Sequence, residues 1–223
     1  MKTLNIFIAS SIVEFHHERE RFIMVMGRLH DYLYENNICN LVIKRCEDFE
    51  ISILKEGHST QDLLNDQIKE SDITLFFFGK KIGGVSKMEL DLAFSNYLEN
   101  GYSKPFVFFM KNSFSTDTII YKNELSNNGI KYIDVDDFDE IIVRTIFYIN
   151  HVYNFNLDFK VFKDKLWVQD EFIMDEISKI KNLDIIYDNE YINKVVEIKE
   201  EDKIKLYSLM NNVYKNEGGS NND

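Results

Sequence analysis

The 223 residues are enough for one α/β domain and a small appendage, and a hydrophobic content of 44% is enough for a buried core. A net charge of −12 argues against non-specific binding to nucleic acid or to an anionic membrane. The sequence has no apolar run long enough to cross a bilayer, and its N-terminus is better explained as a β-strand than as a signal peptide. Cys39 and Cys46 cannot pair along one strand, so we expect free thiols and a cytoplasmic protein.

Strands and helices alternate through the first 153 residues. Apolar runs predict strands at 4–9, 41–45, 73–78, 106–110 and 131–134. Amphipathic patterns predict helices at 14–37, 60–70, 86–100 and 137–153, with a weakly helical stretch inside 111–129. Ser59 or Thr60 should cap the second helix, and Gly101 should end the third. This alternation predicts an α/β, flavodoxin-like fold, in which a five-stranded parallel sheet has the order 2-1-3-4-5.

The stretch from Ser71 to Phe94, SDITLFFFGKKIGGVSKMELDLAF, combines a buried strand, a glycine-rich turn and a helix. Glycines in the turn allow positive φ and close approach of the backbone to a ligand, and the N–H groups at the start of the helix favour anions. In the predicted strand order, the first strand ends beside this turn, where such folds bind ligands. The predicted substrate-binding residues are Ser10, Ser11, Gly79, Lys80, Gly83 and Ser86, with Lys81 as a further phosphate contact.

Glu89 is the candidate catalytic residue, because we expect it in the first turn of the helix that follows this glycine turn. A structural explanation competes with catalysis. Ser86-x-x-Glu89 is also a complete capping-box pattern, which by itself accounts for both residues and stabilises a helix by about 1 kcal/mol. In the same way, Ser10 and Ser11 can act as caps of the first helix.

Other polar residues have structural interpretations. The charged cluster Glu18–Arg21 is interpreted as a solvated helix face, and His16, His17 and His30 as exposed or boundary positions of the same helix. We therefore expect no metal site.

The pattern changes after Tyr153. Alternating apolar residues in 156–168 predict a β-hairpin, and helices are expected near 170–181 and 200–215. We divide the chain into a domain at 1–153, a hairpin and helical appendage at 154–216, and a disordered tail at 217–223. The appendage is too small for a core of its own and should dock on the domain or on a partner, with Trp167 as a packing anchor.

Two segments carry a family resemblance: IFIASS, and QDLLNDQIKESDITLFFFGKKIGGVSKMELDLAF. Together they resemble bacterial TIR and TIR-like domains, over about residues 4–150. The resemblance implies a flavodoxin-like fold and cleavage of the nicotinamide–ribose bond of NAD+ in antiphage defence, by a glycohydrolase or a cyclase. It implies activation by assembly, either as a homo-oligomer or with a partner protein of the defence system. It places the catalytic glutamate of the family at Glu89 and its upstream serine at Ser86, while Lys87–Met88 depart from the aromatic or Cys often found there.

The chemistry of this bond suits a single carboxylate. Nicotinamide leaves as a neutral molecule, so no strong acid is needed, and Glu89 can stabilise the oxocarbenium-like ribose. NAD+ is then the substrate, and no cofactor is expected. Two alternatives remain open: a non-catalytic TIR-like signalling module, and an enzyme like the nucleoside deoxyribosyltransferases. The latter class needs a second carboxylate, which only Glu47, Asp48 or Glu50 can supply in the acidic loop 47–58.

Overall fold

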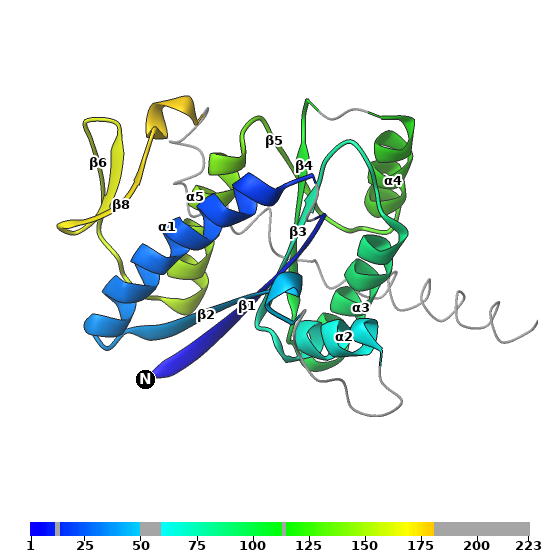
Figure 1. The fold of residues 1–223 in the computed structure, drawn as a ribbon, viewed down its shortest axis with the longest axis horizontal. Coiled ribbons are helices and arrows are strands. Elements are labelled where there is room, and N and C mark those ends of the chain that lie inside the picture. The colour runs from blue at the N-terminus through cyan, green and yellow to red at the C-terminus, as the bar shows by residue number, and fades with distance from the viewer. Residues whose placement is uncertain (12–13, 50–58, 113–114, 181–223) are drawn as a thin grey trace, which may run out of the picture.

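A five-stranded parallel sheet forms the centre of the molecule (Figure 1). The structure is a computed structural model, and it describes residues 1–11, 14–49, 59–112 and 115–180. The strand order is β2-β1-β3-β4-β5, as predicted. The strands are β1 (Lys2–Ser10), β2 (Cys39–Arg45), β3 (Ile73–Phe78), β4 (Lys104–Met110) and β5 (Ile133–Val135).

Helices cover both faces of this sheet (Figure 1). One face packs against α1 (His16–Glu35) and α5 (Phe138–Tyr153), and the other against α2 (Thr60–Glu70), α3 (Gly84–Asn100) and α4 (Thr116–Asn127). As predicted, Ser59 caps α2 in a capping box with Asp62, and Gly101 ends α3 in the left-handed conformation.

The central strand β3 explains why the sheet has two apolar faces. All six of its residues are buried, as the sequence ITLFFF requires of a strand covered on both sides. Leu75 and Phe77 belong to the core on the α1 side, whereas Phe76 and Phe78 belong to the core on the α3 side. Alternate residues of β3 therefore contribute to the two hydrophobic cores, one on each face of the sheet.

Neighbouring strands end at the same edge of the sheet. Ser10, the last residue of β1, pairs with Phe77 of β3, and Ile8 pairs with both Leu75 of β3 and Arg45 of β2. The segments that follow β1, β2 and β3 therefore leave the sheet side by side. The segment after β2 is a short 3-10 helix, η1 (Cys46–Phe49).

A second, antiparallel sheet follows α5. It consists of β6 (Phe159–Phe162), β7 (Lys165–Val168) and β8 (Glu171–Asp175), and η2 (Ile177–Lys179) comes after it. The β6–β7 pair confirms the predicted hairpin, but the helix predicted near 170–181 is wrong. The pairing of β7 with β8 skips Ile173, and this bulge places Ile173 and Met174, two consecutive residues, in the core. The alternation that marks a strand is therefore missing from the sequence.

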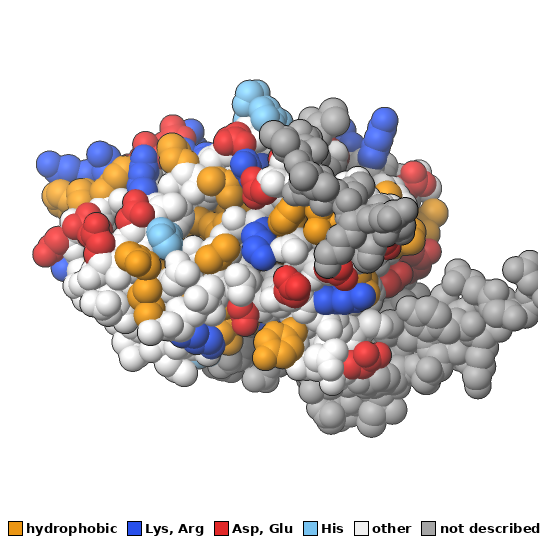
Figure 2. All heavy atoms as spheres, turned by 60° about the horizontal axis from the view of Figure 1, so that its bottom comes forward, with side chains coloured by type: hydrophobic (Ala, Val, Ile, Leu, Met, Phe, Trp, Pro, Cys, Tyr) orange, Lys and Arg blue, Asp and Glu red, His pale blue; other side chains and the backbone are white. Residues whose placement is uncertain are grey.

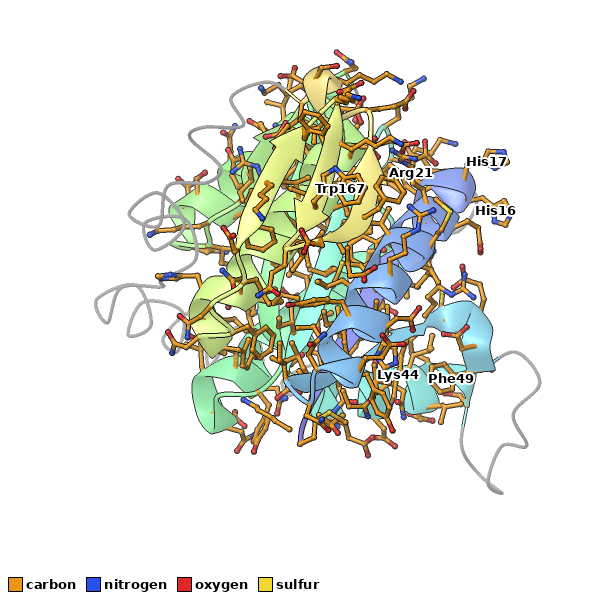
Figure 3. All side chains as sticks on the ribbon, turned by 90° about the vertical axis from the view of Figure 1, so that its left-hand side faces the viewer. His16, His17, Arg21, Lys44, Phe49 and Trp167 are labelled. Atoms are coloured by element: carbon orange, nitrogen blue, oxygen red, sulfur yellow. The ribbon has the colours of Figure 1, made fainter. Side chains whose placement is uncertain are left out.

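The second sheet packs on α1 and α5 rather than standing apart (Figure 3). Leu166, Val168 and Met174 are fully buried in the core that also contains the inner faces of these helices. Arg21 of α1 bonds to Asp139 of α5 at 2.6 Å and to Asp175 of β8 at 3.4 Å. The described part of the appendage thus covers an apolar helix layer.

The surface bears charges of both signs. Figure 2 shows acidic and basic side chains interspersed over the face that it draws. No helix in the described part of the chain has the length and apolar content needed to cross a membrane. The helix predicted at 200–215, the tail at 217–223 and residues 50–58 of the acidic loop lie outside the described residues.

Candidate functional site

Glu89 lies in the second turn of α3, so Glu89 cannot act as part of a helix cap. The helix begins at Gly84, with Gly83 as its N-cap, and its first turn contains no acidic residue. Within the described residues, no side chain caps this end of the helix. The predicted capping box of Ser86 and Glu89 is therefore wrong: Glu89 is too far into the helix to reach the N-cap amide.

The Glu89 side chain is buried at the carboxyl edge of the sheet, with only 7% of the residue exposed. Its Oε1 accepts a hydrogen bond of 3.4 Å from Nε2 of Gln61, which lies in the first turn of α2. Burial raises the pKa of Glu89, and the Gln61 hydrogen bond and the positive charge of Arg19 oppose part of this rise. The site therefore contains a desolvated carboxylate that is held by an amide and lies within the field of a buried cation.

Arg19 is that cation, and it is fully buried. Its Nη1 donates to the Ser10 carbonyl oxygen at 2.9 Å and to Ser10 Oγ at 2.7 Å. Its Nη2 forms an ion pair with Glu47 and contacts Cys46 Sγ at 3.5 Å. Among the described residues, its Nε has no hydrogen-bond partner. We call Ser10, Arg19, Cys46 and Glu47 the arginine cluster.

Sequence reasoning missed Arg19, although a signal for it exists. The interpretation of Glu18–Arg21 as a solvated face is wrong for Arg19, which lies three residues before the buried Phe22. The buried stripe of α1 continues from Phe22 to Met26, and Phe15 begins it, so position 19 falls on the apolar face. An arginine on that stripe is buried and needs partners, which makes it a candidate for a functional or structural ion pair.

A second group of contacts surrounds the turn after β3. The Lys80 amide N–H donates to Glu14 Oε1 at 2.6 Å, and the Glu14 amide N–H donates to Ser11 Oγ at 3.3 Å. A Cβ on Gly79 would lie 2.0 Å from the same Glu14 oxygen, so a side chain at position 79 would displace the Glu14 carboxylate. We call Ser11, Glu14, Gly79 and Lys80 the turn cluster.

The glycines of this turn differ in their role from the prediction. The positive-φ glycines of the described residues are Gly101 and Gly129, so the turn does not use this freedom. The group that lies close to Gly79 is the Glu14 carboxylate, and a Cβ at position 79 would meet it. A Cβ on Gly84 would meet nothing within 4 Å.

The predicted site residues are distributed over these two clusters and the start of α3. Ser10 belongs to the arginine cluster, and Ser11, Gly79 and Lys80 belong to the turn cluster. Gly83 and Ser86 lie at the beginning of α3, where a Cβ on Gly83 would be 3.7 Å from Ser86 Oγ. Lys81 is exposed. Neither Gln61 nor Glu14 was predicted, because hydrogen bonds between distant segments leave no local pattern.

The described residues contain no group of three or more His, Cys, Asp or Glu side chains that can hold a metal ion. His16 and His17 are exposed and project from the end of α1 (Figure 3), and Cys39 and Cys46 are both free thiols. The groups at this edge include carboxylates, backbone amides, the Cys46 thiol and the buried guanidinium of Arg19.

No family model matches the chain, and no curated protein matches it either. Among solved structures, the chain is similar to a CMP N-glycosidase of Clostridium botulinum, BcmB. The sequence identity is 17%, the TM-score is 0.39, and the match covers 64% of this chain and 98% of that chain. A similarity of this size carries no activity over to this chain, so its function has to be inferred from its own residues.

Proposed function

We propose that the chain is an N-glycoside-cleaving enzyme with Glu89 as its catalytic carboxylate, and that its substrate is NAD+. One observation carries this proposal: Glu89 is buried at the carboxyl edge of β1 and β3 and takes no part in helix capping. In parallel α/β sheets this edge is where ligands bind. A desolvated carboxylate at such an edge is a typical functional group.

The reaction breaks the bond between the ribose C1′ and the nicotinamide nitrogen. The electron pair of this bond leaves with the pyridine ring, which becomes neutral, and the ribose develops positive charge. The Glu89 carboxylate stabilises this charge electrostatically, and it does so more strongly because it is buried. Water then attacks C1′ and loses a proton, which gives ADP-ribose. Gln61 orients the carboxylate, and Arg19 favours its ionised form.

The test is incubation of the pure protein with NAD+ and measurement of free nicotinamide. Glu89→Gln should abolish release without lowering the melting temperature, because Glu89 is not a cap. Glu99→Gln is the matched control, since Glu99 is an exposed residue at the other end of the same helix. Wild-type turnover in Glu89→Gln would exclude Glu89 as the catalytic group.

A second candidate is an enzyme like the nucleoside deoxyribosyltransferases, and the second carboxylates at this edge favour it. Glu47 lies in the arginine cluster and Glu14 in the turn cluster. Of the other residues predicted for this role, Asp48 pairs with Arg45, and Glu50 lies outside the described residues. Release of free base from deoxynucleosides, without release of nicotinamide from NAD+, would select this candidate. If neither substrate is cleaved, a non-catalytic TIR-like module remains.

Control by assembly, as a homo-oligomer or with a defence partner, stays a prediction. A constitutive NAD+ hydrolase would deplete its host, so we expect the rate per subunit to rise with protein concentration as the active conformation becomes populated. The measurement is specific activity across a dilution series, with the molar mass followed in parallel. A constant rate per subunit for a protein that remains monomeric would contradict self-association as the control.

A further inference from the structure

The peptide unit between Gly79 and Lys80 is held from both sides. The Gly79 carbonyl oxygen accepts a hydrogen bond of 3.3 Å from Thr118 Oγ1, in the first turn of α4. The Lys80 N–H of the same peptide donates to Glu14 Oε1. Because the C=O and N–H of a trans peptide point in opposite directions, the buried Thr118 hydroxyl aims this N–H away from α4 and toward the start of α1.

A carboxylate oxygen lies in front of this N–H. A Cβ on Gly79 would lie 2.0 Å from Glu14 Oε1, 2.4 Å from its Cδ and 2.9 Å from its Oε2. A methyl group and a carboxylate oxygen therefore compete for the same volume. Lys80 and Lys81 are exposed on the same turn and add positive charge. The observed partner of the Lys80 N–H is thus an anionic oxygen.

We propose that the Lys80 amide is a phosphate subsite, which Glu14 fills in the free protein and which a phosphate of the substrate takes over on binding. This rests on the proposed function, because the turn lies at the same sheet edge as Glu89. The substrate is then a nucleotide rather than a nucleoside. One N–H cannot serve two anions, and the repulsion between a carboxylate and a phosphate at contact requires Glu14 to leave.

Binding of AMP and adenosine, measured by calorimetry, tests the subsite separately from the chemistry. All measurements use the full chain with Glu89→Gln, so that no substrate is consumed. AMP should bind more tightly than adenosine. Adding Glu14→Gln should tighten AMP binding about tenfold, which corresponds to ~1.4 kcal/mol, and leave adenosine unchanged. Glu35→Gln, an equal charge change at the exposed far end of α1, should alter neither affinity.

Gly79→Ala provides the second arm. Alone, Gly79→Ala should displace the Glu14 carboxylate at a small cost in melting temperature, because the new methyl group meets the end of a flexible side chain. The Gly79→Ala/Glu14→Ala pair should remain folded but bind AMP no better than adenosine, since the methyl group occupies the oxygen position. The Glu14→Ala single variant should retain the preference for AMP.

Three results would overturn the subsite: equal affinities for AMP and adenosine, no gain with Glu14→Gln, or full AMP binding in the Gly79→Ala/Glu14→Ala pair. Each leaves the proposed function standing if the wild-type chain releases nicotinamide. The converse result is a wild-type chain that cleaves no substrate, while the binding experiments show the preference for AMP and the effect of Glu14→Gln. That result would support the phosphate subsite and exclude the proposed reaction.

Discussion

Replacing Arg19 with methionine should destabilise the protein far more than replacing an arginine whose ion-pair partners are exposed. Methionine fills a similar volume but removes the guanidinium that joins the end of β1 to Glu47. The Glu47 side chain is 21% exposed, so it is left partly buried without a partner, and Ser10 loses two hydrogen bonds. Breaking a buried ion pair in this way costs about 3–5 kcal/mol, and the partial exposure of Glu47 favours the lower end, about 3 kcal/mol.

The assay is thermal and chemical denaturation, with an arginine whose ion-pair partners are exposed as the control. A loss of about 3 kcal/mol should lower the melting temperature by roughly 6–12 °C in a chain of this size. Arg45→Met is the control: the Arg45 side chain is 20% exposed, but its partners Glu20 and Asp48 are 55% and 37% exposed and stay in contact with water, so its loss should cost about 1 kcal/mol.

A double variant separates the ion pair from the packing. Adding Glu47→Gln to Arg19→Met should restore roughly 1–2 kcal/mol, because the carboxylate is no longer left without its partner. If Arg19→Met costs no more than Arg45→Met, or if Glu47→Gln makes the Arg19 variant worse, the arginine cluster does not stabilise the fold as argued.

Three further predictions concern single positions. Burial raises the pKa of Glu89 above its ordinary value of 4.5, so ionisation of Glu89 lowers the stability of the fold as pH rises. Glu89→Gln should therefore raise the melting temperature at neutral pH. Thermal unfolding at several pH values should show that this gain disappears below pH ~4. Gly101→Ala, at φ 75°, should lower the free energy of unfolding by about 1 kcal/mol, whereas Gly27→Ala inside α1 should raise it by about 0.5–1 kcal/mol, as measured by denaturant titration. Arg21→Met should loosen the contact of the second sheet with α1, so hydrogen exchange in β8 should be faster than in the wild type while exchange in β3 stays unchanged. Unchanged protection of β8 would show that this ion-pair network does not anchor the sheet.

The main sheet was predictable because its signals are local and agree with one another. Each strand is a short apolar run, each helix between strands has an apolar stripe, and boundary residues such as Ser59 and Gly101 act through their own backbone. The strand β8 was not predictable, because its bulge places Ile173 and Met174 together in the core. Two consecutive buried residues are compatible with a helix. Only the pairing with β7 shows that this segment is a strand.

The site was predictable only in part, for a related physical reason. Glu89 and the turn that precedes its helix come from one contiguous stretch, so topology alone places them at the carboxyl edge. The partners that define their environment come from elsewhere: Gln61 from α2, Arg19 and Glu14 from the segment after β1. Hydrogen bonds between such distant positions depend on how the helices pack on the sheet, and a single sequence contains no record of that packing.

The electrostatics of Glu89 also bear on the choice between structure and function. A structural carboxylate is expected to gain stability from its partners, as Asp62 does by closing the capping box of α2. Glu89 shows the reverse balance, because burial outweighs both the Gln61 hydrogen bond and the charge of Arg19, and the ionised form costs stability. In the proposed N-glycosidic reaction, the growing positive charge on the ribose would offset the burial of Glu89 further than Gln61 and Arg19 do. This interaction would form only in the transition state, which is where an interaction increases the rate.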